Sequence, residues 1–126
     1  ASSTNVITML TATAPNFDGE WQSLYQCGRI VRDTNGNVAS ITEMKDCSEE
    51  ERTIRELNTG LYCFDAEWLW GHIDKLTTSN AQGEYYLTDM VSLAIAEGKD
   101  VGTVELDPRE SFGINSQEDL QKAHVL

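Results

Sequence analysis

The pattern of hydrophobic and polar positions predicts three separate strands. Residues 6–14, VITMLTATA, are rich in β-branched side chains and carry apolar residues on both faces, which favours a buried strand. The runs LNTGLYCF at 57–64 and VGTVEL at 101–106 have the composition of further strands. Residues 16–26, NFDGEWQSLYQ, follow neither the strand nor the helix period, so we expect an irregular loop there.

A β-hairpin is predicted around Asn35-Gly36. GRIVRD at 28–33 and VASITE at 38–43 are two short apolar runs on either side of this dipeptide. Both turn residues readily accept a positive φ, as the tight turn of a hairpin requires.

Four helices follow from capping residues and apolar spacing. Ser48 with Glu51 forms a capping-box pattern for a short helix within 48–56, and Asp65 is a plausible cap for residues 66–76, whose apolar side chains recur at helical spacing. Thr88, alone or with Asp89, is expected to cap MVSLAIAEG, which Gly98 ends, and Ser116 begins the last helix.

Strands alternate with these helices along the chain, which favours an α/β sheet with at least one parallel crossover. The length of 126 residues suits one domain, residues 1–126. The pattern contains no repeat, low-complexity stretch or linker that would divide it.

Composition and charge narrow the function classes. A net charge of −12, with nine scattered Lys and Arg residues, repels a polyphosphate backbone, so we expect no nucleic-acid partner. No apolar run approaches the roughly 20 residues that cross a bilayer, and the start ASSTNV lacks a basic region, so we expect neither a membrane partner nor secretion. Three cysteines without CxxC spacing fit a cytoplasmic protein.

Most motifs with known chemistry are missing from these residues. Neither a phosphate-cradling glycine loop nor GxSxG is present. His72 and His124 are interpreted as surface or satisfied, partly buried side chains rather than ligands or bases. The three cysteines, Cys27, Cys47 and Cys63, are interpreted as buried or inert thiols.

Four polar residues stand where strands should end or loops begin: Glu43, Asn58, Thr88 and Asn115. In α/β proteins ligands gather outside the carboxyl ends of strands and at helix starts, so these side chains could line a cleft. An alternative stays open, in which both asparagines form turns, Thr88 is only a cap and Glu43 is solvated.

The order of several motifs resembles one enzyme family. GRIVRD, ITEMKD, LNTG, NAQGEYYLTD and FGIN before SQEDL occur with the order and approximate spacing of the pyrophosphorylase domain of bacterial N-acetylglucosamine-1-phosphate uridyltransferase. The resemblance covers about Val6 to His124 and begins midway through that domain. It implies a truncated, Rossmann-like nucleotide-sugar transferase domain with a mixed sheet and flanking helices.

The resemblance also implies roles for individual residues. The family joins UTP to N-acetylglucosamine 1-phosphate with Mg²⁺ and releases pyrophosphate. The glycine whose backbone amide meets the ligand would be Gly28, and the acid and the amide side chain that hold the sugar would be Glu43 and Asn58. Tyr86 and Thr88 would line the sugar pocket, and Asn115 would be the metal-binding asparagine. Of these, Asn115 would serve Mg²⁺ through its carbonyl oxygen. None is expected to be catalytic by itself.

The sequence departs from the family pattern at two places. Cys27 stands where the family usually has a tyrosine, and the loop before it is longer than the family's connection. The family's glycine-rich loop, which carries the cationic residues that bind the UTP phosphates, is not found before Val6.

Three functions are therefore compared. The first is a sugar-phosphate-binding half, inactive alone, that takes N-acetylglucosamine 1-phosphate or UDP-N-acetylglucosamine. The second is an oligomeric interaction module with a vestigial sugar pocket. The third is an enzyme completed by a complementary N-terminal half, in which the sugar phosphate oxygen attacks the α-phosphorus of UTP. An exposed strand edge and apolar surface predict a homo-oligomer or such a partner.

Overall fold

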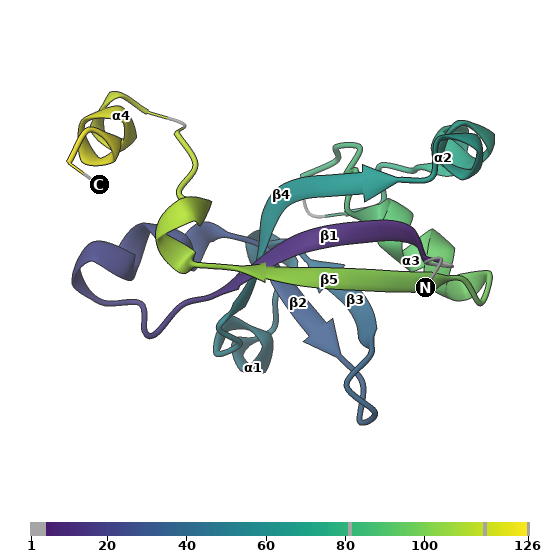
Figure 1. Ribbon diagram of the computed structural model, residues 1–126, viewed down its shortest axis with the longest axis horizontal. Coiled ribbons are helices and arrows are strands. Elements are labelled where there is room, and N and C mark those ends of the chain that lie inside the picture. Colours follow the sequence, from purple (N-terminus) through teal and green to yellow (C-terminus); the bar gives the residue numbers. More distant parts are fainter. Residues whose placement is uncertain (1–4, 81, 115, 126) are drawn as a thin grey trace.

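The computed structural model describes residues 5–80, 82–114 and 116–125. Its centre is a five-stranded sheet in the order β3-β2-β4-β1-β5 (Figure 1). The strands are β1 Asn5–Thr13, β2 Arg29–Arg32, β3 Val38–Thr42, β4 Glu56–Phe64 and β5 Asp100–Leu106. The helices are α1 Glu49–Arg52, α2 Ala66–His72, α3 Asp89–Ala96 and α4 Gln117–Ala123, and short 3₁₀ helices are η1 Gly19–Gln26, η2 Met44–Asp46, η3 Ile73–Lys75 and η4 Pro108–Ser111.

The sheet is mixed. β1 runs parallel to β5 and antiparallel to β4, while β2 pairs antiparallel with both β3 and β4. The chain that joins β1 to β5 contains all the other strands and helices α1 to α3, so the expected parallel crossover is present. The predicted α/β class, with a mixed sheet and flanking helices, is confirmed.

The main core lies between the sheet and helices α2 and α3. Strand side chains from β1, β2 and β3 meet Trp68 of α2 and three residues of α3, because the apolar stripe of each helix turns toward the sheet. The buried members are Ile7, Met9, Ile30, Val38, Ile41, Trp68, Met90, Val91 and Ala94. In Figure 1, α2 and α3 lie at one end of the molecule and α4 at the other.

The segment before β2 differs from its prediction. Residues 19–26 form the 3₁₀ helix η1 instead of an irregular loop. Leu24, 2% exposed, anchors it in a second apolar cluster with Ala14 and Leu57, and Trp21 stacks on Phe112 with ring centroids 5.9 Å apart. These contacts join distant parts of the sequence, so the local pattern of polar and apolar residues did not indicate them.

The predicted hairpin is confirmed, although its turn is not the expected one. Only Gly36 has a positive φ, of 83°, and Asn35 does not. Asp33 organises the turn, because its Oδ1 accepts bonds from the backbone N–H groups of Asn35 and Asn37 at 2.9 and 3.0 Å. The loop therefore needs one left-handed residue, and glycine supplies it without a Cβ clash.

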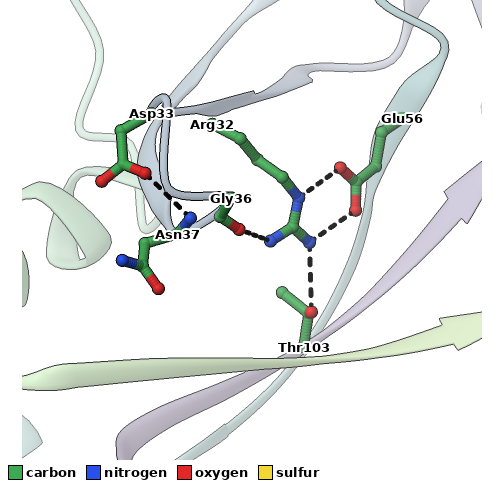
Figure 2. A network of polar contacts seen from close by, with 6 residues as sticks. All are labelled: Arg32, Asp33, Gly36, Asn37, Glu56 and Thr103. Carbon is green, nitrogen blue, oxygen red and sulfur yellow. Dashed lines mark hydrogen bonds and ion pairs between the residues drawn. The ribbon is translucent and has the colours of Figure 1, made fainter.

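Arg32 fastens the hairpin to the rest of the sheet (Figure 2). Its guanidinium makes a bidentate pair with Glu56 of β4 at 2.7 and 2.8 Å, and donates to the Gly36 carbonyl at 2.8 Å. A further bond of 3.2 Å reaches Thr103 of β5. One side chain on β2 thus contacts the hairpin turn and two other strands.

The helix-capping predictions are largely confirmed. Ser48 and Glu51 form both bonds of the capping box, Asp65 accepts from Trp68 N at 3.1 Å, and Ser116 accepts from Asp119 N at 3.0 Å. Gly98 ends α3 with a φ of 72°. The predicted helix over 66–76 stops at His72, where φ is −126°, directly after the weak helix former Gly71, and η3 follows.

Candidate functional site

The starts of β2 and β4 and the end of β3 lie together, and they bring three predicted site residues to one place. Gly28 precedes β2, Glu43 follows β3, and Asn58 is the third residue of β4. The backbone N–H of Asn58 donates to the Gly28 carbonyl at 2.9 Å. A Cβ on Gly28 would lie only 3.3 Å from Oε2 of Glu43, so the glycine lets this carboxylate approach the backbone.

These three residues line a hollow of about 470 Å³. Its other walls come from the end of η1 with Cys27, from Thr59 and Gly60 of β4, and from Phe112 and Gly113 after η4. The sequence-based interpretation missed the η1 wall and Phe112. The stack of Phe112 on Trp21 explains why both belong to one wall, although only the aromatic content of residues 16–26 hinted at it.

A second hollow of about 570 Å³ lies beside the first, between η1 and α4. It shares Phe112, Gly113, Asp119 of α4 and two residues of η1 with the first hollow. Its charged lining residues also include Glu20, Glu118 and Lys122. Among the described residues, none of the predicted site residues Gly28, Glu43, Asn58, Tyr86 and Thr88 lies in its wall. The convergence of Gly28, Glu43 and Asn58 makes the first hollow the candidate site.

Thr88 supports Glu43 instead of capping α3. Its hydroxyl makes no capping bond, contrary to the prediction, and donates to Oε1 of Glu43 at 3.2 Å. Thr88 is 6% exposed and is not part of the hollow's wall. Thr88, at the start of α3, therefore positions the Glu43 carboxylate without itself lining the hollow.

The Glu43 carboxyl sits in an acidic surrounding. Burial raises its pKa, the bond from Thr88 lowers it, and the nearby carboxylates of Asp46 and Asp89 raise it further. The pKa of Asp89 is also raised, by burial and then by Asp46. Glu43 therefore takes up a proton more readily than an exposed glutamate, and a ligand that donates hydrogen bonds or carries positive charge would oppose this effect.

Tyr86 lies near these carboxylates, outside the wall of the first hollow. Its hydroxyl is buried, and the part of the chain that the structure describes offers it no hydrogen-bond partner. Removal from solvent raises the pKa of Tyr86, and the carboxylates of Asp46 and Glu43 add to the rise. Tyr86 is therefore affected by the charge of Glu43, but it does not line the hollow that Gly28 and Asn58 share.

Asn80 organises the polar stretch before α3. Its Oδ1 accepts from the backbone N–H groups of Gln82 and Glu84, each at 3.2 Å, and its Nδ2 donates to the Glu84 carbonyl at 2.6 Å. The loop thus closes on one asparagine and leads to Tyr86. The asparagine at the start of NAQGEYYLTD has a structural role in this loop.

Asn58 uses its amide oxygen within its own strand. Oδ1 accepts from the backbone N–H of Gly60 at 3.0 Å and from the Tyr62 hydroxyl at 2.8 Å. Burial raises the pKa of Tyr62 far above its ordinary value, which keeps the phenol protonated. Asn58 thus takes part in the turn-like contact of the alternative interpretation and also lines the hollow.

The predicted magnesium ligand Asn115 lies outside the described residues. Within residues 5–80, 82–114 and 116–125, no group of three or more His, Cys, Asp or Glu side chains is placed to hold a metal ion.

His72 makes polar contacts with two helices, and the three cysteines differ in exposure. His72 lies 2.5 Å from Oε2 of Glu97 through Nε2, and its Nδ1 is 2.8 Å from the Trp68 carbonyl, so it links α2 to the end of α3. Burial raises the pKa of both Cys27 and Cys47, which disfavours the reactive thiolate. Cys63, in contrast, is exposed.

Comparison with known proteins extends the resemblance drawn from the motifs. The chain is 45% identical over 119 residues to the bifunctional protein GlmU of Clostridium novyi, a match that covers 94% of this chain and 25% of the relative. It is 44% identical over 122 residues to GlmU of Clostridium beijerinckii, covering 97% of the chain and 25% of that protein. The chain is related to GlmU.

GlmU of Brevibacillus brevis gives a similar match, with 45% identity over 94% of this chain and 24% of the relative. The chain therefore spans about a quarter of the length of the curated GlmU relatives it matches. No protein-family model matches it. In the described part of the chain, no helix has both the length and the apolar character needed to span a membrane.

Proposed function

We propose that the hollow beside Gly28, Glu43 and Asn58 binds the sugar phosphate of a nucleotidyl-transfer reaction, either N-acetylglucosamine 1-phosphate or its UDP-linked form. The observation that carries this proposal is the convergence of three residues that lie far apart in the sequence but share one wall. Each is a residue that the resemblance to the uridyltransferase family assigns to the sugar. The similarity to GlmU supports the resemblance on which this assignment rests.

The chemistry of the hollow suits a sugar. Glu43 supplies carboxylate oxygens that accept hydrogen bonds from hydroxyl groups, and the Asn58 amide carries two N–H donors. Gly28 leaves room for a ligand to approach the backbone. The Thr88 hydroxyl holds the Glu43 carboxylate in this wall. A sugar contact by Tyr86 and a role for Asn115 with Mg²⁺ remain predictions from the resemblance.

We expect these 126 residues to bind the sugar phosphate without turnover when tested alone. Nucleotidyl transfer depends on neutralising the phosphate charge, and the described hollow contains acidic rather than basic side chains. Turnover would require a second polypeptide segment that supplies the cationic nucleotide-binding part. A cytoplasmic location also stays a prediction.

A specific observation favours a second candidate, an oligomeric interaction module. β5 is an edge strand of the sheet, and its Val104 is 51% exposed. Leu61 of β4 and Trp70 of α2 are 51% and 70% exposed. Exposed strand edges and large apolar side chains promote association between chains. A concentration-dependent dimer in sedimentation, together with no sugar binding, would support this candidate over the first.

The test of the first candidate is calorimetric titration with N-acetylglucosamine 1-phosphate and with UDP-N-acetylglucosamine, each with and without Mg²⁺. We expect saturable binding that Asn58→Ala abolishes. Asn37→Ala is the matched control, since Asn37 lies in the hairpin turn away from the hollow, and should bind like the unaltered chain. Absence of binding by the unaltered chain at millimolar ligand would overturn the proposal.

A further inference from the structure

The orientation of the Asn58 amide is fixed by two donors. An asparagine side chain can turn so that either its oxygen or its nitrogen faces a given neighbour, and the surrounding hydrogen bonds decide between them. Here the backbone N–H of Gly60 faces one of these atoms at 3.0 Å, and a backbone N–H can only donate. That atom is therefore the oxygen, and the Tyr62 hydroxyl, 2.8 Å from the same atom, must donate to it as well.

The shape of β4 makes this contact possible. The register between β4 and β1 is interrupted between Met9 and Thr11, and Gly60 takes a φ of 84° inside the strand. Such an irregularity redirects the strand locally. Thr59 fastens the irregular segment to β1, because its hydroxyl donates to the Leu10 carbonyl at 2.7 Å.

The nitrogen end of the amide is what Asn58 has left to offer a ligand. No described residue accepts a hydrogen bond from its Nδ2, whereas both donors to its oxygen come from its own strand. Asn58 lines the same hollow as Glu43, whose ionised carboxylate can only accept. The hollow therefore combines a donor at Asn58 with an acceptor at Glu43.

We propose that Tyr62 is a positioning residue that holds the Asn58 amide with its N–H₂ group available to the hollow, so that the site selects a ligand with a hydrogen-bond acceptor at this position. This inference rests on the proposed function for its ligand, a sugar phosphate. It predicts that an acetamido substituent, whose carbonyl accepts, is favoured over an ammonium substituent, which only donates.

The first test compares affinities for N-acetylglucosamine 1-phosphate and glucosamine 1-phosphate. Tyr62→Phe removes only the hydroxyl, so the preference for the acetamido ligand should fall about three- to tenfold, the range expected for one hydrogen bond. Tyr85→Phe is the matched control, since Tyr85 is 71% exposed, and should keep the preference of the unaltered chain. An unchanged preference in Tyr62→Phe would overturn the positioning role.

Asn58→Asp separates the donor from the fold. A carboxylate keeps both bonds, from Gly60 and Tyr62, but replaces the N–H₂ group with a second acceptor. This variant should unfold at the same denaturant concentration as the unaltered chain, lose at least about tenfold in affinity for the acetamido ligand and shift its preference toward the ammonium ligand. Unchanged affinity for the acetamido ligand would show that the amide nitrogen is not used.

A measurement without ligand tests whether the orientation of the Asn58 amide is fixed. In the isotope-labelled chain, a through-hydrogen-bond coupling should connect the Gly60 amide nitrogen to Cγ of Asn58, and it should weaken in Tyr62→Phe. Absence of this coupling in the unaltered chain would show that the Asn58 amide is not held in this orientation, whichever ligand binds. If the coupling is present but neither sugar binds, the proposed function fails and the orientation of Asn58 stands.

Discussion

Two arginines of strand β2, three residues apart, differ in the surroundings of their charges. Arg32 is at the hairpin end, partly exposed, and shares a bidentate pair with Glu56. Arg29 is at the end beside the hollow and is 0% exposed. Its guanidinium contacts the carbonyl of Cys27, the Arg52 carbonyl at 3.3 Å and the rings of Phe17 and Tyr25.

The buried charge of Arg29 costs stability, whereas the paired and partly exposed charge of Arg32 does not. Among the described residues no carboxylate is in salt-bridge contact with Arg29, its Nε has no partner, and burial lowers its pKa. A buried charge without an opposite partner is unfavourable unless polar and aromatic groups replace its hydration. Around Arg29, two carbonyls and the rings of Phe17 and Tyr25 replace this hydration. Because Arg29 also donates to the carbonyl of Cys27, the residue before Gly28, it helps to fix the wall of the hollow.

The largest expected effect comes from breaking the buried end. Arg29→Ala should reduce the free energy of unfolding by about 3–5 kcal/mol, because a cavity opens and two partly buried carbonyls lose their donor. Arg32→Ala should reduce the free energy of unfolding by about 1 kcal/mol or less, since its ion pair with Glu56 lies at the surface and is partly exposed. Urea denaturation of both variants measures the comparison.

If Arg29→Ala does not fold, Arg29→Lys and Arg29→Met keep most of the volume. Arg29→Lys can still donate to one carbonyl and should be more stable than Arg29→Met, which cannot donate at all. Equal losses for Arg29→Ala and Arg32→Ala, or greater stability of Arg29→Met, would contradict the structural role given to the buried guanidinium.

A smaller effect is expected at the exposed end. In a double-mutant cycle, Arg32→Ala and Glu56→Ala should show a coupling of about 0.5–1 kcal/mol, which decreases as salt screens the pair. The single-contact pair of Lys122 and Glu118 on α4, 3.1 Å apart, is the control and should couple by about 0.3–0.5 kcal/mol. A coupling at Arg32 no larger than in this control would mean that its two-pronged geometry adds nothing.

The same two ends of β2 show what the sequence can and cannot predict. The hairpin and the capping box of Ser48 and Glu51 depend on residues close together in the chain, so their patterns carry the signal. The burial of Arg29 depends on Phe17, Tyr25 and the fold of η1, and nothing in GRIVRD distinguishes it from Arg32.

The candidate site divides in the same way. Family resemblance picked out Gly28, Glu43 and Asn58, which the structure brings together, but local reasoning treated Thr88 as a helix cap. Its actual partner, Glu43, is 45 residues earlier in the chain. A cap and a buried hydrogen-bond donor use the same residue type, so only the tertiary structure separates them.

The smallest expected effect is a gain in stability at the site end. Burial raises the pKa of Glu43 in the folded chain, so the native state binds a proton more readily than the unfolded state. Stability therefore falls as pH rises from the ordinary glutamate value through the raised one, and remains lower above it. Glu43→Gln keeps an oxygen for the Thr88 hydroxyl and carries no charge, so it should be more stable than the unaltered chain near pH 7 and similar to it in acid.

Glu51→Gln is the matched control, with the opposite sign. The backbone N–H of Ser48 lowers the pKa of Glu51 in the folded chain. The Glu51 carboxylate therefore stabilises the fold at pH values above the pKa that it has in the unfolded chain, and this contribution is lost as the pH falls. Thermal or urea unfolding from pH 3 to 8 should show Glu51→Gln less stable than the unaltered chain at neutral pH, with the difference shrinking in acid. If both differences have the same sign, ionisation of the partly buried Glu43 carboxyl does not destabilise the fold. If they differ and Glu43→Gln also loses sugar binding, the hollow keeps this charge for its ligand at the expense of the fold.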